Sequence, residues 1–204
     1  IGREIISDAL LIDIGSTTTD IIPIRERKVA TEALTDHDRL CKSALVYIGC
    51  RRTPVCSLVN SLDYQNISTP VMNELFATID DAMLLLGHAS ENVNDCGTAD
   101  GKPRTRPLAT NRIARMIGLD RRNVTLHDAK LLAAQIVAVA IQQIGCAVDH
   151  HDPQETWVLS GHGDALISIP ERQATLRLAD LLGVETARSA PAYAVARLKS
   201  TENQ

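Results

Sequence analysis

Aromatic residues are scarce in this chain of 204 residues, at 2% of the total. Trp157, Phe76 and three tyrosines are all of them, too few for the stacking platforms on which proteins hold single-stranded nucleic acid or sugars. Neither sign of charge dominates, because 21 Lys and Arg residues stand against 25 Asp and Glu residues. The composition therefore excludes a broad electrostatic attraction to nucleic acid or to anionic membranes, and we expect neither as a partner.

Paired cysteines and closely spaced metal ligands are also missing. The five cysteines include no C-x-x-C pair and the six histidines no H-x-x-x-H spacing, which argues against a disulfide scaffold and a structural zinc site. No signal peptide is recognisable, and the longest apolar stretch, 131–148, contains three glutamines that would be costly inside a membrane. These absences predict a cytoplasmic protein.

The residues that are present predict an α/β fold. Residues 8–24 form two β-rich runs around a Gly-Ser-Thr-Thr turn, which is typical of a hairpin. Apolar spacing predicts a helix over 70–86, and Thr125 with Asp128 resembles the capping box of a long helix ending near residue 144. A short buried strand over 156–159 precedes a glycine turn and helical material, which is an α/β pattern.

The sharpest motif is D-I-G-S-T-T-T-D, at the end of the first apolar run. Gly15 allows a tight turn, and successive backbone N–H groups and hydroxyls there can converge on phosphate oxygens. The candidate diphosphate or nucleotide ligands are Asp13, Gly15, Ser16, Thr17, Thr18, Thr19 and Asp20. Asp13 is also the candidate magnesium ligand, through water, because hard cations take carboxylate and water oxygens. The alternative is a plain hairpin turn.

A second motif, L-S-G-H-G-D, follows the strand over 156–159. In open α/β sheets ligands bind beyond the carboxyl ends of strands, and glycines there admit a ribose or a phosphate. Gly161 and Gly163 are therefore further ligand-binding candidates, and His162 is a candidate acid–base group. An ordinary turn between a strand and a helix is the alternative.

Basic residues gather between positions 102 and 122, where seven of them accompany a single acid. Such a cluster can bind a diphosphate or the carboxylates of a small anionic substrate, although a solvated helix face is the alternative. The substrate-binding candidates are Arg51, Arg52, Arg104 and Arg112. Glu74 is a second candidate catalytic residue, in addition to His162.

The two glycine turns resemble the second phosphate loop and the adenosine loop of the actin, sugar-kinase and heat-shock-ATPase superfamily. The form DIGSTTTD resembles its hydantoinase A/oxoprolinase branch, and TADGKPRTRPLATNRIARMIGLD resembles the members linked to tetrahydromethanopterin one-carbon metabolism and methanofuran biosynthesis. The resemblance implies an actin-like (ribonuclease H-like) lobe with a mixed sheet. Residues 1–35 and 150–204 would form its α/β core, and residues 36–149 a largely helical insertion.

The resemblance also implies a transferase of an alkyl group. It would join a furan-methyl diphosphate to the phenol oxygen of γ-glutamyltyramine and release diphosphate, which residues 13–20 would hold with magnesium. Gly161, His162 and Gly163 would lie beside the other half of the ligand. An electron-rich furan stabilises a developing carbocation, so the protein would mainly bind the departing diphosphate and position the phenol.

The superfamily closes its cleft between two lobes, each with a phosphate loop, and this sequence shows the pattern of the second lobe only. The chain begins at Ile1 rather than Met, so we expect the N-terminal lobe to be a missing partner and the chain alone to be inactive; a homodimer is left open. Two alternatives remain. One is an ATP-dependent hydantoinase, oxoprolinase or kinase, with ATP as cofactor, and the other is a non-catalytic ligand-binding lobe.

Overall fold

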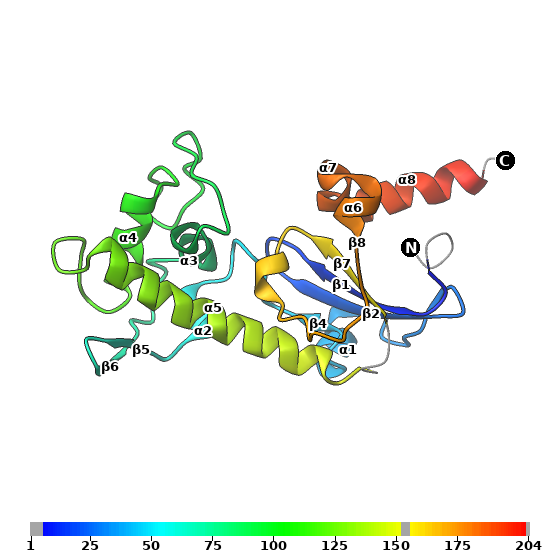
Figure 1. Ribbon diagram of the computed structural model, residues 1–204, viewed down its shortest axis with the longest axis horizontal. Helices are drawn as coiled ribbons and strands as arrows, with labels where there is room; N and C mark the ends of the chain where they lie inside the picture. The colour runs from blue at the N-terminus through cyan, green and yellow to red at the C-terminus, as the bar shows by residue number, and fades with distance from the viewer. Residues whose placement is uncertain (1–5, 152–155, 203–204) are drawn as a thin grey trace. The chain divides into compact units, whose positions relative to one another are not determined.

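The structure is a computed structural model that describes residues 6–151 and 156–202. It has a mixed α/β fold whose contacts divide the chain into two units (Figure 1). The first unit comprises residues 1–47 and 144–204, and the second comprises residues 48–143. The boundaries predicted after residues 35 and 149 differ from these, which lie after residues 47 and 143. The first boundary is later because α1 (Asp36–Cys41) leads into a strand that pairs within the first unit.

A six-stranded mixed sheet forms the first unit. Its strands are β1 (Ala9–Ile14), β2 (Thr19–Arg25), β3 (Lys28–Val29), β4 (Leu45–Val46), β7 (Thr156–Gly161) and β8 (Thr175–Arg177). Strand β1 pairs antiparallel with β2 and parallel with β7, which is parallel to β8 in turn. The mixed sheet and the hairpin over residues 8–24 are therefore confirmed.

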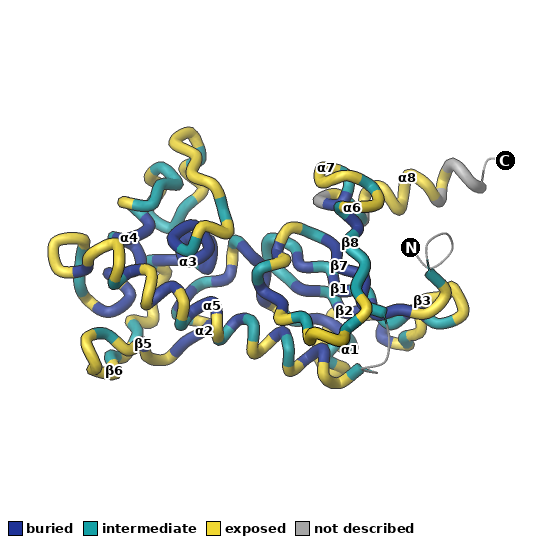
Figure 2. Tube along the Cα trace, viewed as in Figure 1, coloured by how far each residue is buried: buried dark blue, intermediate teal, exposed yellow. Residues whose placement is uncertain are grey.

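Two short helices pack against one face of the sheet, over β1 and β7. Ala9 and Val158 pack with Leu178 of α6 (Leu178–Leu182) and Ala187 of α7 (Val184–Arg188). The opposite face is also buried, since Leu10 and Ile12 are fully enclosed (Figure 2). Strands with two covered faces explain why the run over residues 9–14 is almost wholly apolar. A 3-10 turn (Asp164–Leu166) follows β7, and α8 (Ala190–Glu202) ends the described chain.

The second unit contains a short β-hairpin beside its helices, and the sequence pattern did not predict this hairpin. Its elements are α2 (Val55–Leu58), the hairpin of β5 (Ser61–Tyr64) and β6 (Ile67–Pro70), α3 (Ile79–Leu86), α4 (Arg106–Arg115) and most of α5 (Leu126–Val148). The missed hairpin has a two-residue turn in which Gln65 and Asn66 both have positive φ angles. That is hairpin-turn geometry, which favours Asn.

The helix predicted over residues 70–86 is nine residues shorter at its start. Pro70 ends β6, and the backbone N–H groups of Val71 and Met72 donate to carbonyls of Asn60 and Met116 rather than within a helix. The helix begins after Thr78, whose N–H donates to the Asp81 carboxylate over 3.1 Å. Tertiary hydrogen bonds and this later cap therefore outweigh the apolar spacing upstream.

Helix α5 begins at the predicted capping box, in which Asp128 donates its backbone N–H to the Thr125 hydroxyl over 3.1 Å. It continues through Gly145, where the sequence predicted its end. Within the described residues it is the one helix long and apolar enough to cross a membrane by length and composition. Ala129, Ala133 and Ile136 are fully buried while Leu131 is exposed, which is the one-sided pattern of a core helix.

A buried network of arginines and aspartates holds the second unit together. The guanidinium of Arg112 is fully enclosed and donates to Asp81 over 2.8 Å and to Asp100 over 3.0 Å. Arg104 forms a two-pronged pair with Asp80, the neighbour of Asp81 in the first turn of α3. The polar loop between α3 and α4 is thereby tied to both helices.

We predict that Arg112→Met destabilises the chain by about 3–5 kcal/mol, because the buried Asp81 and the partly buried Asp100 would lose their counter-charge. Equilibrium unfolding in urea measures the change. Arg122→Met is the matched control, since Arg122 is exposed and pairs with Asp120 at the surface, and we expect it to change stability little. Equal effects of the two substitutions would contradict the structural role of Arg112.

Candidate functional site

The D-I-G-S-T-T-T-D motif forms the turn between β1 and β2. The Gly15 N–H donates to the Thr18 carbonyl over 2.9 Å, which closes a four-residue turn at residues 15–18. Ser16, Thr17 and Thr18 are partly exposed in it. Thr19 is a correction to the predicted ligand set, because it begins β2 with its side chain fully buried.

Three polar side chains form a row across neighbouring strands beside this turn. Asp13 is the register partner of Asp20 on β2 and of Ser160 on β7. Side chains at paired positions point to the same face of a sheet and lie within contact range. The pairing therefore brings Asp13 and Asp20, both predicted from the sequence, face to face.

Burial raises the pKa of the Asp13 carboxyl above its ordinary value. The Ser160 hydroxyl lowers this pKa in part, although its geometry falls short of a full hydrogen bond. The charge of Asp20 raises the pKa further, and His162 lowers it. The two carboxylates therefore repel each other, and the site favours a cation between or beside them.

Close approach of the two turns explains both glycines of the second motif. A Cβ atom on Gly161 would lie 2.2 Å from the Ile14 carbonyl oxygen, and one on Gly163 would lie 2.2 Å from the Ile14 side chain. Gly161 also has a φ angle of 86°, and the His162 N–H donates to the Ile14 carbonyl over 3.1 Å. The structure thus brings Gly161, His162 and Gly163 to the Asp13 turn.

Sequence reasoning missed Arg39, which belongs to α1. Its guanidinium forms an ion pair with Asp20, and both side chains are about one-quarter exposed. Arg39 lies 19 positions after Asp20, in a segment without a recognisable motif. No local signal in the sequence could have identified it, because only the pairing of β4 with β2 brings α1 to this place.

The predicted substrate arginines lie in the second unit, where three of the four pair with carboxylates. Arg51 pairs with Asp95, Arg104 with Asp80, and Arg112 with Asp81 and Asp100. We therefore assign Arg104 and Arg112 to the structural network rather than to a substrate. Arg52 is exposed, and Glu74 is exposed in the irregular segment before α3.

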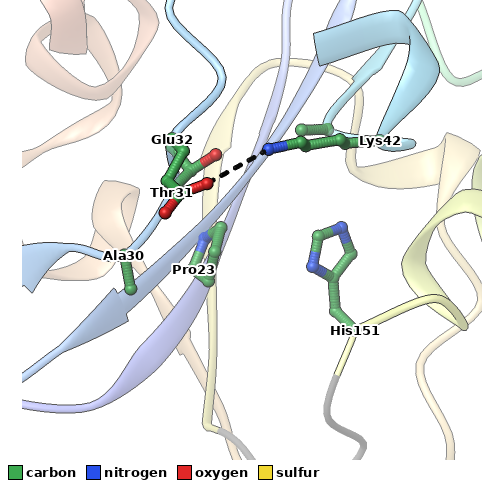
Figure 3. A pocket seen from close by; sticks show the side chains of 7 residues that line it. Pro23, Ala30, Thr31, Glu32, Lys42 and His151 are labelled. Carbon is green, nitrogen blue, oxygen red and sulfur yellow. Dashed lines mark ion pairs between the residues drawn. The ribbon is translucent and has the colours of Figure 1, made fainter. Parts of the chain in front are cut away.

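A hollow of about 630 Å³ lies elsewhere in the first unit (Figure 3). Lys42, Glu32 and His151 line it, and Lys42 lies 3.9 Å from Glu32. None of the predicted site residues is among its lining residues. The candidate site is therefore the surface at the ends of β1 and β7, and not this hollow.

The residues at these strand ends fit a magnesium ion that arrives with phosphate groups. Magnesium is usually held by one or two carboxylates together with water and substrate phosphates. Asp13 supplies a carboxylate, with Asp20 as its register partner, and residues 16–18 supply hydroxyls and backbone N–H groups. Across the described residues no group of three or more His, Cys, Asp or Glu side chains could hold a metal by itself.

The chain belongs to the hydantoinase/oxoprolinase family. The family model for hydantoinase/oxoprolinase matches residues 3–202, which is nearly the whole chain. This membership agrees with the resemblance of the DIGSTTTD turn.

Two curated relatives carry the name (4-{4-[2-(gamma-L-glutamylamino)ethyl]phenoxymethyl}furan-2-yl)methanamine synthase. The protein of Methanocaldococcus jannaschii is 30% identical over 201 residues, covering 96% of this chain and 60% of the relative. That of Methanococcus vannielii is 33% identical over 144 residues, covering 71% of this chain and 64% of the relative. The chain thus spans less than two-thirds of the length of either relative.

Among solved structures, nucleotide-free acetone carboxylase, from work on ATP-dependent acetone carboxylation, matches with a TM-score of 0.45. The match has 16% sequence identity and covers 78% of this chain and 24% of that chain. A likeness of this size does not define the fold.

We predict that Gly161→Ala destabilises the chain by roughly 2–4 kcal/mol, because the added methyl meets the Ile14 carbonyl and the φ angle disfavours it. Gly145→Ala is the matched control, since nothing lies within 4 Å of its added Cβ. Alanine in helix α5 should raise stability by about 0.5–1 kcal/mol. Thermal unfolding compares the two, and a neutral Gly161→Ala would contradict the close approach of the turns.

Proposed function

We propose that this chain supplies the diphosphate-binding part of a synthase that makes an aryl furan-methyl ether. The observation that carries the proposal is the junction of the Asp13–Asp20 turn with the Gly161–Gly163 turn. Its support from outside the structure is the synthase name of two relatives at 30% and 33% identity. The substrates would be a furan-methyl diphosphate and the phenol of γ-glutamyltyramine.

In this reaction the phenol oxygen forms a bond to the furan methylene carbon, and the carbon–oxygen bond to diphosphate breaks. Diphosphate departs with the electron pair, and the phenol proton passes to solvent or to a nearby base. Hydroxyls and N–H groups of residues 16–18 would donate to the departing oxygens, which stabilises charge as it develops. Magnesium, when bound, would supply further positive charge there, with Asp13 as its ligand.

His162 is the candidate base within the first unit, because it is exposed beside Asp13. We do not extend this role to Glu74, which belongs to the second unit. We further propose that the first unit is the actin-like lobe of the superfamily. The remaining length of the relatives would then include the N-terminal lobe, with the other phosphate loop of the cleft.

The proposal is tested on the complete protein, with the furan-methyl diphosphate and γ-glutamyltyramine as substrates and mass spectrometry of the ether as the readout. We expect ether and diphosphate in equal amounts without ATP. Absence of ether, together with ATP binding or turnover, would favour an ATP-dependent hydantoinase, oxoprolinase or kinase. If neither activity appears and substitutions at the turn are silent in cells, the chain is a non-catalytic ligand-binding lobe.

We predict that Asp13→Asn lowers kcat/KM for ether formation roughly 100-fold, through lost charge stabilisation of the diphosphate complex. Thr18→Val should cost about tenfold, the value of one hydrogen bond to a charged group. Asp8→Asn is the matched control, since Asp8 is an exposed carboxylate just before the other end of β1, and its rate should be unchanged. An unaffected rate for Asp13→Asn would remove the turn from the mechanism.

A further inference from the structure

The candidate diphosphate site poses a charge problem. Asp13 and Asp20 are register partners on antiparallel strands, so their carboxylates face each other beside the turn that would hold an anion. Like charges at such positions repel each other and would also repel a diphosphate. A local positive charge is needed for this arrangement to hold an anionic ligand.

Arg39 provides a positive charge at this place. Its guanidinium pairs with Asp20, and its second contact is Asp36 on the same helix at 3.4 Å. The Arg39 carbonyl accepts the Ala44 N–H over 2.8 Å, and the Ala44 carbonyl accepts the Ile21 N–H over 3.0 Å. These two hydrogen bonds tie the backbone of Arg39 to β2, the strand that carries Asp20.

Helix α1 is also fixed at its start by a capping box. The Asp38 N–H donates to the Thr35 hydroxyl over 3.1 Å, and the Asp38 carboxylate accepts the Thr35 N–H over 3.2 Å. The backbone that carries Arg39 is therefore held at both ends. The Asp20–Arg39 pair is thus preorganised before any ligand arrives.

We propose that Arg39 is a positioning residue for the diphosphate site: it cancels the charge of Asp20 and holds that carboxylate, so that Asp13 alone faces a magnesium diphosphate. This inference rests on the proposed function for the identity of the ligand. Arg39 sets the formal charge beside the turn. Asp13, Asp20 and Arg39 together carry one negative charge, whereas Asp13 and Asp20 without Arg39 carry two.

The proposal predicts changes of opposite sign for two probes. Arg39→Met should weaken binding of magnesium inorganic diphosphate about tenfold, because one more negative charge faces the anion. The same variant should tighten binding of Mn²⁺ alone by a similar factor, because two uncompensated carboxylates attract a free cation. Calorimetry measures the first affinity and the paramagnetic resonance signal of free Mn²⁺ the second. Loss of the fold would weaken binding of both probes, so tighter Mn²⁺ binding distinguishes the removal of charge from misfolding.

Two further variants test the route through Asp20. Arg39→Met combined with Asp20→Asn restores the local charge, so both affinities should return to within about threefold of the original protein. Arg39→Lys keeps the charge and should retain most of the diphosphate affinity. Lys42→Met is the matched control, because Lys42 directly follows the same helix but lies 3.9 Å from Glu32 rather than beside Asp20. It should leave both affinities unchanged.

Each contrary result has a definite meaning. Diphosphate binding that stays weak in the double variant would show that Arg39 touches the ligand itself, which overturns the positioning role. Mn²⁺ binding that does not tighten in Arg39→Met would overturn the charge cancellation. If the original protein binds no magnesium diphosphate, the proposed function fails at this site, and the Mn²⁺ measurement still decides the role of Arg39.

Discussion

The parallel pairing of β1 with β7 is the contact on which the candidate site depends. It joins residues that are almost 150 positions apart and sets Asp13 opposite Ser160 and Ile14 opposite Gly161. Because the side-chain period of a strand is two, a slip of one residue would move Asp13 to the other sheet face. The approach of Gly161 and Gly163 to Ile14 leaves no room for a Cβ atom and so enforces this register.

The two units use charge in different ways. In the second unit, arginines and aspartates are buried together, and the polar loop before α4 is held by them. In the first unit, the Asp13, Asp20 and Arg39 groups are partly exposed at the ends of the strands. Buried pairs mainly fix one arrangement of the chain, whereas partly exposed ones remain available to a ligand.

Membership of the hydantoinase/oxoprolinase family rests on a match over residues 3–202. The synthase relatives are longer than this chain, and the activity in their name is a property of those longer proteins. What the chain contributes is a turn with hydroxyls, a carboxylate with a raised pKa, and a paired arginine. These groups suit the binding of a departing anion better than covalent catalysis, since no nucleophile is activated among them.

The sequence by itself determined the hairpin, its Gly-Ser-Thr-Thr turn, the glycine turn after β7 and the capped helix α5. Each of these depends on neighbouring residues: a turn needs Gly15, and a cap needs Thr125 and Asp128 three positions apart. Only the tertiary structure decided the roles of the charged residues. Arg112 has the pattern of a solvated helix residue yet is enclosed with Asp81 and Asp100, and Arg39 has no motif yet pairs with Asp20. The ion-pair partner of a charged residue depends on how distant segments pack together, and the local spacing of residues does not encode that packing.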